Sequence, residues 1–350
     1  MNNPDGRVPF LIAGPCSAES REQVLSTAAS LSGKGVDLFR AGLWKPRTRP
    51  GNFEGLGARG LEFLLEARSL YGLKICTEVG SASHAEACLE AGLDAVWIGA
   101  RTTTNPFLVQ EIASALGSCA VTVFVKNPIN ADLQLWIGAV ERLQKAGVKN
   151  LGLVHRGFSS YAAIRYRNSP QWQIAAGMRR AFPSLPMLCD PSHMGGRADV
   201  VEELSRRAMS LGMDGLMVEV HCNPREALSD GPQQLAPEEF LRMVQALKVA
   251  RSGEGDAAFG RSVAAYRERM DVIDEAIIDL LGQRMELSRL IAARKKEEGV
   301  SVLQLARWDE VMERVRRLAR SGGLDTEFVE SVFDTIHAAS IAEQNSIIEK

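Results

Sequence analysis

Four side chains with metal-binding chemistry fall at or just after the ends of apolar, strand-like segments. They are Cys16, His193, Glu219 and Asp230. One thiolate, one imidazole and two carboxylates form a mixed ligand shell that suits a divalent Mn, Fe, Co or Zn ion. Taken singly, a loop histidine is usually structural, and a cysteine usually packs as a small apolar group. The four lie far apart in the chain, so a metal site requires a fold that brings them together.

The stretch LCDPSHMGGR at 188–197 shows how one of these residues is delivered. An apolar strand interior ends abruptly at Asp190, and His193 follows within the same bend. Gly195 and Gly196 then permit a tight turn close to a ligand. The stretch therefore predicts a strand whose end carries a histidine into a site.

Charged side chains follow most of the other predicted strands as well. Loops are generally polar, so any one of these charges has an ordinary explanation. A ring of cations over the dry end of a barrel, however, needs anions to hold it. The cations are Arg40, Lys45, Arg47, Arg101, Lys126 and Arg156. The acids and histidines at strand ends are Glu78, His155, Asp190 and His221. We expect nearly all of these groups to meet at one mouth.

Eight short apolar runs alternate with helical stretches in the first 220 residues. The runs occupy 9–14, 36–41, 73–79, 94–99, 120–126, 150–155, 185–190 and 214–220. Such runs are typical of a parallel sheet buried on both faces. Eight units in this length predict a (β/α)8 barrel, with its chemistry in the loops that follow the strands. A doubly wound open sheet is the alternative, but GPCS at 14–17 lacks the GxGxxG pattern of a dinucleotide turn.

The pattern changes beyond residue 249. The segment ARSGEGDAAFG at 250–260 has linker composition. Residues 261–298 lack proline and carry apolar side chains at steps of three and four, which predicts one long helix. Two more helices are expected at 305–321 and 325–348. A helix this long protrudes from a three-helix unit, so we expect a homodimer through this region, or a larger assembly built on it. The predicted segments are a barrel domain at 1–249, a linker at 250–260 and a helical domain at 261–350.

The composition is that of an ordinary globular protein and restricts the classes of partner. Of 350 residues, 45% are hydrophobic, and 41 Lys and Arg balance 43 Asp and Glu. This balance gives no global basic field for nucleic acid or an anionic membrane. The six cysteines show no CxxC spacing, which favours a reducing compartment. The sequence shows no targeting segment or membrane-length apolar run, so we expect a cytoplasmic protein.

Nine short motifs in residues 8–248 resemble 3-deoxy-D-arabino-heptulosonate 7-phosphate synthase. They are GPCS, FRAGLWKPRT, TEVG, GART, VKNP, HRG, DPSHMGGR, EVH and ALSDG. The resemblance implies a metal-dependent condensation of phosphoenolpyruvate with erythrose 4-phosphate. It also implies that Cys16, His193, Glu219 and Asp230 are the metal ligands.

The same resemblance implies roles for the cations at the strand ends. The family's phosphoenolpyruvate site matches Arg40, Lys45, Arg101, Lys126 and Arg156. Lys45 is also expected to take part in catalysis, and Arg47 and Thr48 to contact the phosphate of the aldose. The closest rival is the related synthase that uses arabinose 5-phosphate. The KPRT motif at 45–48 argues against it, because that relative carries an asparagine-containing motif there.

Arg284 is a charge within the apolar stripe of the predicted long helix. Its ordinary explanations are a polar residue that sets the register of a coiled coil, or a salt bridge within the chain. Lys295 lies eleven residues further on, which at about 3.6 residues per turn places it on the same face. Ser340 and Gln344 share a face of the last helix through their i,i+4 spacing.

These positions resemble the all-helical class of chorismate mutase over residues 261–350, with VAAYRERMDVIDEAIIDLLGQR at 263–284 as its signature. The residues at that family's spacings are Arg267, Arg284, Lys295, Arg307, Ser340 and Gln344. In the family two arginines bind the substrate carboxylates, one of them from the partner chain. A lysine and a glutamine hydrogen-bond the ether oxygen, so Arg284, Lys295 and Gln344 are the expected catalytic residues. Gln304 and Trp308 depart from the pattern, where an acid and a glutamate are expected.

Together the two resemblances predict a bifunctional enzyme of the shikimate pathway, in the biosynthesis of chorismate and aromatic amino acids. The barrel would be a transferase and the helical domain an isomerase that converts chorismate to prephenate. Feedback by prephenate bound in the helical domain is a further hypothesis. The alternative is a synthase whose helical domain is catalytically silent and serves dimerisation or ligand sensing.

Overall fold

The computed structural model describes residues 9–46, 51–160, 165–247 and 257–348. The chain divides into two compact units, Met1–Ser252 and Gly253–Lys350. Among the described residues, every named strand belongs to the first unit, and the second unit is helical.

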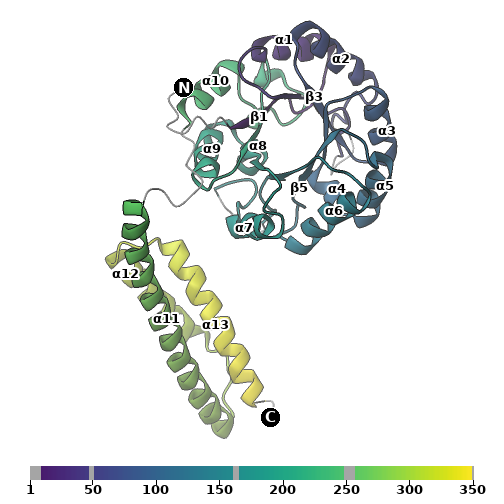
Figure 1. The fold of residues 1–350 in the computed structure, drawn as a ribbon. Helices are drawn as coiled ribbons and strands as arrows, with labels where there is room; N and C mark the ends of the chain where they lie inside the picture. Colours follow the sequence, from purple (N-terminus) through teal and green to yellow (C-terminus); the bar gives the residue numbers. More distant parts are fainter. Residues whose placement is uncertain (1–8, 47–50, 161–164, 248–256, 349–350) are drawn as a thin grey trace. The chain divides into compact units, whose positions relative to one another are not determined.

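Eight parallel strands close into a barrel in chain order, and β1 pairs with β8 (Figure 1). The strands are β1 (Phe10–Gly14), β2 (Leu38–Arg40), β3 (Ile75–Val79), β4 (Ala95–Ile98), β5 (Thr122–Lys126), β6 (Leu151–His155), β7 (Met187–Cys189) and β8 (Gly215–Glu219). Each lies within one of the eight apolar runs. The predicted (β/α)8 barrel is therefore confirmed.

Helices form the outer ring of the barrel (Figure 1). They are α1 (Arg21–Leu31), α2 (Arg59–Tyr71), α3 (Ala82–Glu90), α5 (Pro106–Leu116), α6 (Leu133–Lys145), α7 (Trp172–Ala181), α9 (Val201–Ser210) and α10 (Pro237–Ala246). The short helices α4 (Ala100–Thr103) and α8 (Pro191–Gly195) belong instead to the loops directly after β4 and β7. Short 3-10 turns lie at η1 (Ala198–Val200), η2 (Pro224–Glu226) and η3 (Gly231–Gln233). Side-chain caps mark several helix starts; for example, Ser20 and Asp132 accept backbone N–H groups at the first turns of α1 and α6.

Two layers of apolar side chains stabilise the barrel. The inner layer fills the space between the strands and includes Trp97 and Phe124. The outer layer packs the strands against the helices and includes Phe39 and Trp136. Because both faces of the strands are buried, the runs are continuously apolar in the sequence.

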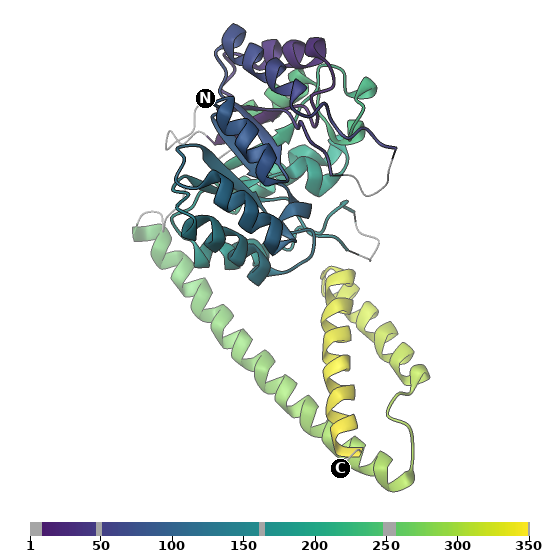
Figure 2. The same cartoon turned by 90° about the vertical axis from the view of Figure 1, so that its right-hand side faces the viewer.

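The second unit consists of α11 (Ala257–Glu298), α12 (Leu305–Ser321) and α13 (Thr326–Ile348). The predicted all-helical fold is confirmed. The first helix begins at Ala257 instead of residue 261, because a single glycine, Gly260, is tolerated inside a long helix. Residues 250–256 of the predicted linker lie outside the described residues. Figure 2 shows the first half of α11 extending away from the other two helices.

The apolar stripe of α11 is exposed along this first half. Tyr266, Met270, Ile273, Ile277 and Leu280 have between 49% and 64% of their surface accessible. An exposed apolar row of this length is typical of a surface that another protein covers.

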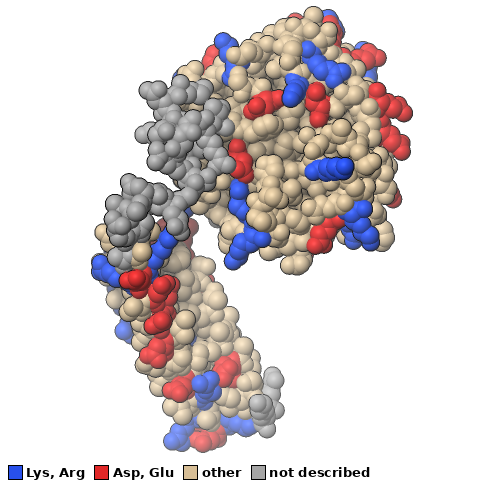
Figure 3. All heavy atoms as spheres, viewed as in Figure 1, with Lys and Arg blue, Asp and Glu red and all other residues tan. Residues whose placement is uncertain are grey.

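No helix in the described part of the chain is long and apolar enough to cross a membrane. On the face of the barrel unit drawn in Figure 3, basic and acidic side chains are interspersed. That face offers no broad basic surface of the kind that binds nucleic acid.

Candidate active sites

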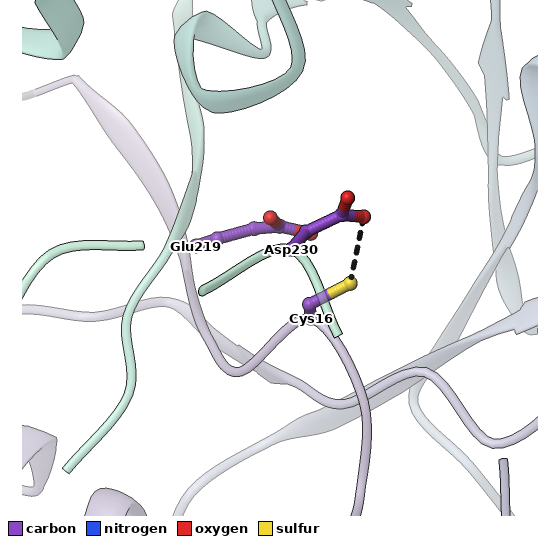
Figure 4. A group of neighbouring side chains, drawn as sticks. All are labelled: Cys16, Glu219 and Asp230. Carbon is purple, nitrogen blue, oxygen red and sulfur yellow. Dashed lines mark hydrogen bonds between the residues drawn. The ribbon is translucent and has the colours of Figure 1, made fainter. Parts of the chain in front are cut away.

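Closure of the barrel brings three of the four predicted metal ligands together (Figure 4). Gly14 of β1 pairs with Glu219 of β8, so the loop that carries Cys16 starts beside Glu219. Asp230 arrives from the loop between β8 and α10. The ligand atoms of Cys16, Glu219 and Asp230 all lie within 4.8 Å of one another. The Cys16 thiol donates to Asp230 Oδ2 at 3.4 Å.

The donor set of this group fits a divalent metal ion. Cys16 and Glu219 are fully buried. Burial raises the pKa of the Cys16 thiol to about 12, and the nearby charge of Glu219 adds to the effect. The thiol therefore keeps its proton at neutral pH unless a cation takes the place of that proton. Two carboxylates and a thiolate this close together repel one another, and a bound divalent cation would relieve that repulsion.

His193, the fourth predicted ligand, lies at the edge of this group. Its Nε2 is 3.6 Å from Glu219 Oε1, and its Nδ1 is 2.8 Å from Asp190 Oδ2. Asp190 Oδ1 also accepts the backbone N–H of His193 at 3.0 Å, which caps the start of α8. One carboxylate thus fixes both the backbone and the ring of His193. A carboxylate behind a histidine in this way is typical of metal sites.

Glu219 is held from behind by a buried arginine. Arg40 Nη2 donates to Glu219 Oε1 at 3.0 Å, and neither side chain is accessible to solvent. Burial raises the pKa of Glu219, but the charges of His193 and Arg40 outweigh it and the pKa is lowered. The guanidinium lies 4.8 Å from the ring centroid of Trp97. Arg40 therefore supports the metal group from inside the barrel.

Asp230 is held by a second network. Arg167 Nη1 donates to Asp230 Oδ1 at 3.1 Å and to Gln233 Oε1 at 2.9 Å. Gln233 Nε2 in turn donates to Glu219 Oε2 at 2.7 Å. Gly196 adopts a φ of +70°, and the side chain of Arg167 packs where a Cβ would stand. The predicted tight turn is present, and it makes room for this arginine.

A cavity of about 230 Å³ opens beside the metal group. Predicted site residues in its wall are Lys45, Arg101, Lys126, Arg156, His193 and Asp230. Glu78, Arg167 and Asn168 line it as well. Arg47 and Thr48, the predicted contacts to the aldose phosphate, lie outside the described residues. Several cations around one cavity suit an anionic ligand.

Two of the cavity cations are fixed by buried partners. Lys126 Nζ lies 2.6 Å from Asp190 Oδ2; burial lowers the pKa of this lysine, and the carboxylate opposes that shift. Arg156 Nη1 donates to Asn168 Oδ1 at 2.9 Å, and burial lowers its pKa to about 10. Held in this way, both cations are ready to bind an anion without rearrangement.

Two histidines at strand ends face away from the cavity. His155 Nε2 lies 2.6 Å from the carbonyl oxygen of Pro170, and its ring packs near Trp136. His221 Nε2 lies 3.5 Å from a carboxylate oxygen of Glu19. The prediction that nearly all strand-end side chains meet at the mouth is wrong for these two. Alternate residues of a strand face opposite sides, so the end of a strand does not by itself place a side chain in the site.

In the second unit, several hydrogen bonds join α11 to α13, and two of them involve predicted site residues. Arg284 Nη1 donates to Ser340 Oγ. Gln344 Nε2 donates to Ser288 Oγ at 3.0 Å. Arg284 thus contacts Ser340, and Gln344 bonds Ser288 one turn further along both helices; the helical spacing predicted only that Ser340 and Gln344 share a face. Among the described residues Arg284 forms no ion pair, which disfavours the salt-bridge alternative.

Within the described residues, the other three predicted site cations of this unit make no hydrogen bond with the Arg284–Ser340 pair. Lys295 Nζ donates to the carbonyl of Val302 at 2.7 Å, and Arg307 pairs with Glu310 at 2.8 Å. Arg267 is exposed on the first half of α11. It precedes Arg284 by seventeen residues, or about 25 Å along a helix. Arg267 therefore cannot join Arg284 within one chain.

Trp308 stacks on His337, with ring centroids 3.8 Å apart. A glutamate is expected at this position, so an aromatic pair replaces a carboxylate. Burial lowers the pKa of His337, and the charge of Arg284 adds to the effect. Gln304, the other departure, precedes α12 and makes no capping hydrogen bond through its side chain.

Comparison with known families matches each unit separately. Residues 3–252 match the DAHP synthetase I family. The chain belongs to this family. Residues 266–345 match the family described as chorismate mutase type II. The chain thus carries a DAHP synthase domain, a transferase, followed by a chorismate mutase domain, an isomerase, which together form a bifunctional shikimate-pathway enzyme.

Individual relatives agree with the match to the DAHP synthetase I family. The phospho-2-dehydro-3-deoxyheptonate aldolase of Thermotoga maritima is 39% identical over 238 residues, 68% of this chain and 68% of the relative. A crystal structure under that name from the same organism superposes with a TM-score of 0.61 at 36% identity, covering 69% of this chain and 72% of the other. The 2-dehydro-3-deoxyphosphooctonate aldolase of Geobacter sp. (strain M21) is 28% identical over 268 residues, 69% of this chain and 92% of the relative.

Several residues of the barrel site were not predicted from the sequence. Trp97 is an inward-facing residue of β4 beneath the cations. Arg167, Asn168, Gln233 and Gln234 lie in loops away from strand ends. The adjacent glutamines three and four residues after Asp230 were a visible signal, but uncharged amides have no chemistry of their own that marks them as part of a site.

Proposed function

We propose that the barrel condenses phosphoenolpyruvate with erythrose 4-phosphate in a metal-dependent reaction. The observation that carries this proposal is the group of Cys16, Glu219 and Asp230 beside a cavity lined by cations. Both substrates carry a phosphate, and phosphoenolpyruvate adds a carboxylate, so several fixed cations are required. The name of the Thermotoga maritima relative supports a product with seven carbons.

Cys16, His193, Glu219 and Asp230 would hold the divalent ion, which can be Mn, Fe, Co or Zn. The chemistry that such an ion supplies when bound is Lewis-acid polarisation of the aldehyde oxygen. The second ring nitrogen of His193 is already engaged by Asp190, which leaves Nε2 for this role.

The chain's own cations bind and orient the two substrates. Arg40, Lys45, Arg101, Lys126 and Arg156 form the phosphoenolpyruvate site, and Arg47 and Thr48 bind the aldose phosphate. In the reaction C3 of phosphoenolpyruvate bonds to the aldehyde carbon, water adds at C2, and inorganic phosphate leaves. Fixing two anionic reactants in one geometry removes much of the entropic barrier.

Lys45 is the proposed proton-bearing group at the aldehyde oxygen. Burial lowers its pKa, but the neighbouring Cys16 and Glu78 outweigh this, and the pKa is raised. The ammonium group therefore stays charged beside the cavity. Gly42 permits its approach, because a Cβ there would lie 2.7 Å from Lys45 Nζ.

For the helical domain we propose rearrangement of chorismate to prephenate in a homodimer. Arg284 binds one substrate carboxylate, and Lys295 and Gln344 donate to the ether oxygen, with Arg307 and Ser340 completing the site. Arg267 enters from the partner chain, which agrees with its distance from Arg284. The exposed apolar stripe of α11 is the dimer surface. This chemistry needs only a compact pose and donors aimed at developing negative charge.

Prephenate bound in the helical domain is proposed to inhibit the synthase. Coupling requires that the ligand favour one arrangement of the two domains. The test is the synthase rate during a prephenate titration in the full-length enzyme, in Arg284→Ala and in a chain that ends near residue 250. Inhibition is expected in the first only. Equal inhibition of the shortened chain would contradict the idea.

Product analysis separates these proposals from their rivals. The full-length protein is incubated with phosphoenolpyruvate and either erythrose 4-phosphate or arabinose 5-phosphate, and the sugar product is identified by mass spectrometry. We expect the seven-carbon product to dominate; a preference for the eight-carbon product would assign the related synthase activity. Chorismate loss is followed in parallel. A helical domain that binds prephenate without converting chorismate would establish the silent, ligand-sensing alternative.

The enzyme is proposed to work in the cytoplasm. All six cysteines are free, as expected for a reducing compartment.

A further inference from the structure

Two adjacent glutamines, Gln233 and Gln234, contact the metal-ligand segments without belonging to the predicted ligand set. They are 1% and 2% exposed. Both follow Asp230 closely, at the end of η3. The proposed condensation uses neither of them, so their burial in this place needs another explanation.

The carboxamide of Gln234 joins the segment of Cys16 to the segment of Asp230. Its Oε1 accepts the backbone N–H of Cys16 at 3.0 Å. Its Nε2 donates to the carbonyl of Ser229, the residue before Asp230, at 2.8 Å. An amide can do both because it carries a donor and an acceptor. One side chain therefore ties together the backbones beside two ligands that are 214 residues apart.

Two further contacts fasten the same segments. The hydroxyl oxygens of Ser17 and Ser229 lie 2.6 Å apart, and both side chains are buried. The backbone N–H of Leu228 donates to Glu19 Oε1 at 2.9 Å. The separation between Cys16 and Asp230 is thus set by a local network of hydrogen bonds around the ligands.

Gln233 acts on the third ligand. Its Nε2 donates to Glu219 Oε2 at 2.7 Å, while its Oε1 accepts from Arg167 at 2.9 Å. Arg167 also binds Asp230 Oδ1 at 3.1 Å. Gln233 therefore holds Oε2 of Glu219 and Arg167 holds Oδ1 of Asp230, and these two donors are hydrogen-bonded to each other. The arrangement fixes the orientation of both carboxylates in the metal-ligand group.

We propose that Gln233 and Gln234 are positioning residues for the divalent metal ion. Gln234 sets the separation between Cys16 and Asp230, and Gln233 sets the orientation of Glu219. This inference rests on the proposed metal-dependent function. Loss of a partner that orients a metal ligand typically weakens metal binding by about 10- to 100-fold.

The test is a Co²⁺ titration of the full-length enzyme after a chelator has removed its metal. Calorimetry measures the Co²⁺ affinity, and the charge-transfer absorption band of the Cys16 thiolate bound to cobalt reports on that ligand. Leucine at position 234 removes both hydrogen bonds at similar side-chain size. We expect Gln234→Leu to bind Co²⁺ about 10- to 100-fold more weakly and to shift the thiolate band. Gln233→Leu is expected to weaken binding while leaving the band in place, because it acts on a carboxylate.

Two more variants keep the test decisive. Ser17→Ala removes only the contact to Ser229 and is expected to weaken binding to a smaller extent, even if Gln234→Leu fails to fold. Ser32→Ala removes a long-range hydrogen bond to the carbonyl of Tyr71 at the other end of the barrel and should bind as the wild type does. If Gln234→Leu folds and its Co²⁺ affinity is unchanged, the positioning role is wrong. If that variant does not fold, unchanged Co²⁺ affinity in Ser17→Ala leads to the same conclusion. Either result leaves the proposed metal-dependent function intact. A wild-type enzyme that binds no divalent ion would overturn the proposed function as well.

Discussion

The thiol of Cys16 donates to Oδ2 of Asp230 across 3.4 Å, although 214 residues separate them in the chain. The pairing of β1 with β8 brings the two loops together. With the buried carboxylate of Glu219 beside them, these donors form a compact group suited to a divalent ion. The contact joins the loop after β1 to the loop after β8. The proposed metal site therefore depends on closure of the barrel between these two strands.

Cys16→Ala should abolish the condensation while leaving the barrel folded. The variant loses the thiolate ligand, but its backbone N–H can still donate to Gln234. We expect the rate with phosphoenolpyruvate and erythrose 4-phosphate to fall to near background. The melting temperature of the metal-free protein should stay within a few degrees of the wild type. A variant with normal activity would remove Cys16 from the metal site.

Arg284→Ala should abolish chorismate turnover without affecting the synthase. The guanidinium bound to Ser340 is the proposed carboxylate partner, and loss of such a donor typically costs about 100-fold or more in rate. Arg289→Ala is the matched control, because Arg289 joins the same two helices through an exposed pair with Glu343. Exposed pairs contribute little, so this control should keep its activity. Equal mutase rates in wild type and Arg284→Ala would show that Arg284 is structural.

Ile277→Glu should make the protein monomeric if the exposed stripe of α11 is the dimer surface that we propose. Ile277 is 49% exposed within the apolar stripe of α11, so a charge there would be buried without a partner in the dimer. Mutase activity should be lost with the proposed dimer, because in that proposal the partner chain supplies Arg267. Leu70→Glu, at an exposed position of the barrel unit, should leave the assembly intact. Sedimentation velocity measures the outcome; a monomeric wild type, or an Ile277→Glu variant that stays dimeric, would rule out this surface.

His155 should make the barrel less stable as the pH falls from 7 to 5. Burial lowers its pKa from 6.5 to about 4. The unfolded chain therefore binds a proton that the folded barrel does not, and stability present above pH 6.5 is lost on acidification. The loss between pH 7 and 5 is about 2 kcal/mol, or several degrees in melting temperature. His155→Phe keeps an aromatic ring near Trp136 but cannot titrate, so its melting temperature should fall less over this interval. An identical fall in both proteins would contradict the assignment.

The barrel could be predicted because parallel strands leave a direct trace in the sequence. Each strand from β1 to β8 is buried on both faces and therefore appears as an unbroken apolar run. The start of α11 was harder to predict from the sequence. Glycine and small residues near its first turn have linker composition, although the chain there is helical. The spacing within the last helix predicted that Ser340 and Gln344 share a face, but not that this face packs against α11.

The site could be predicted only in its charged and metal-binding members. Cys16 and Asp230 stand out by chemistry, whereas Gln234 binds through an uncharged amide whose partners are backbone groups. For His155 the error was of the other kind. The sequence correctly predicted its position at the end of a strand, but its side chain faces the helices and not the cavity. Which way a strand-end residue points depends on the register of the closed barrel, and single-sequence patterns do not fix that register.

The most direct test of two separate chemistries in one chain is metal removal and return, with both activities measured on the same protein. The full-length enzyme is treated with a chelator, assayed with phosphoenolpyruvate and erythrose 4-phosphate and with chorismate, and assayed again after addition of Mn²⁺ or Co²⁺. We expect the condensation to disappear on chelation and to return with metal, while chorismate conversion stays constant throughout. Condensation that persists in the fully chelated enzyme would contradict the account.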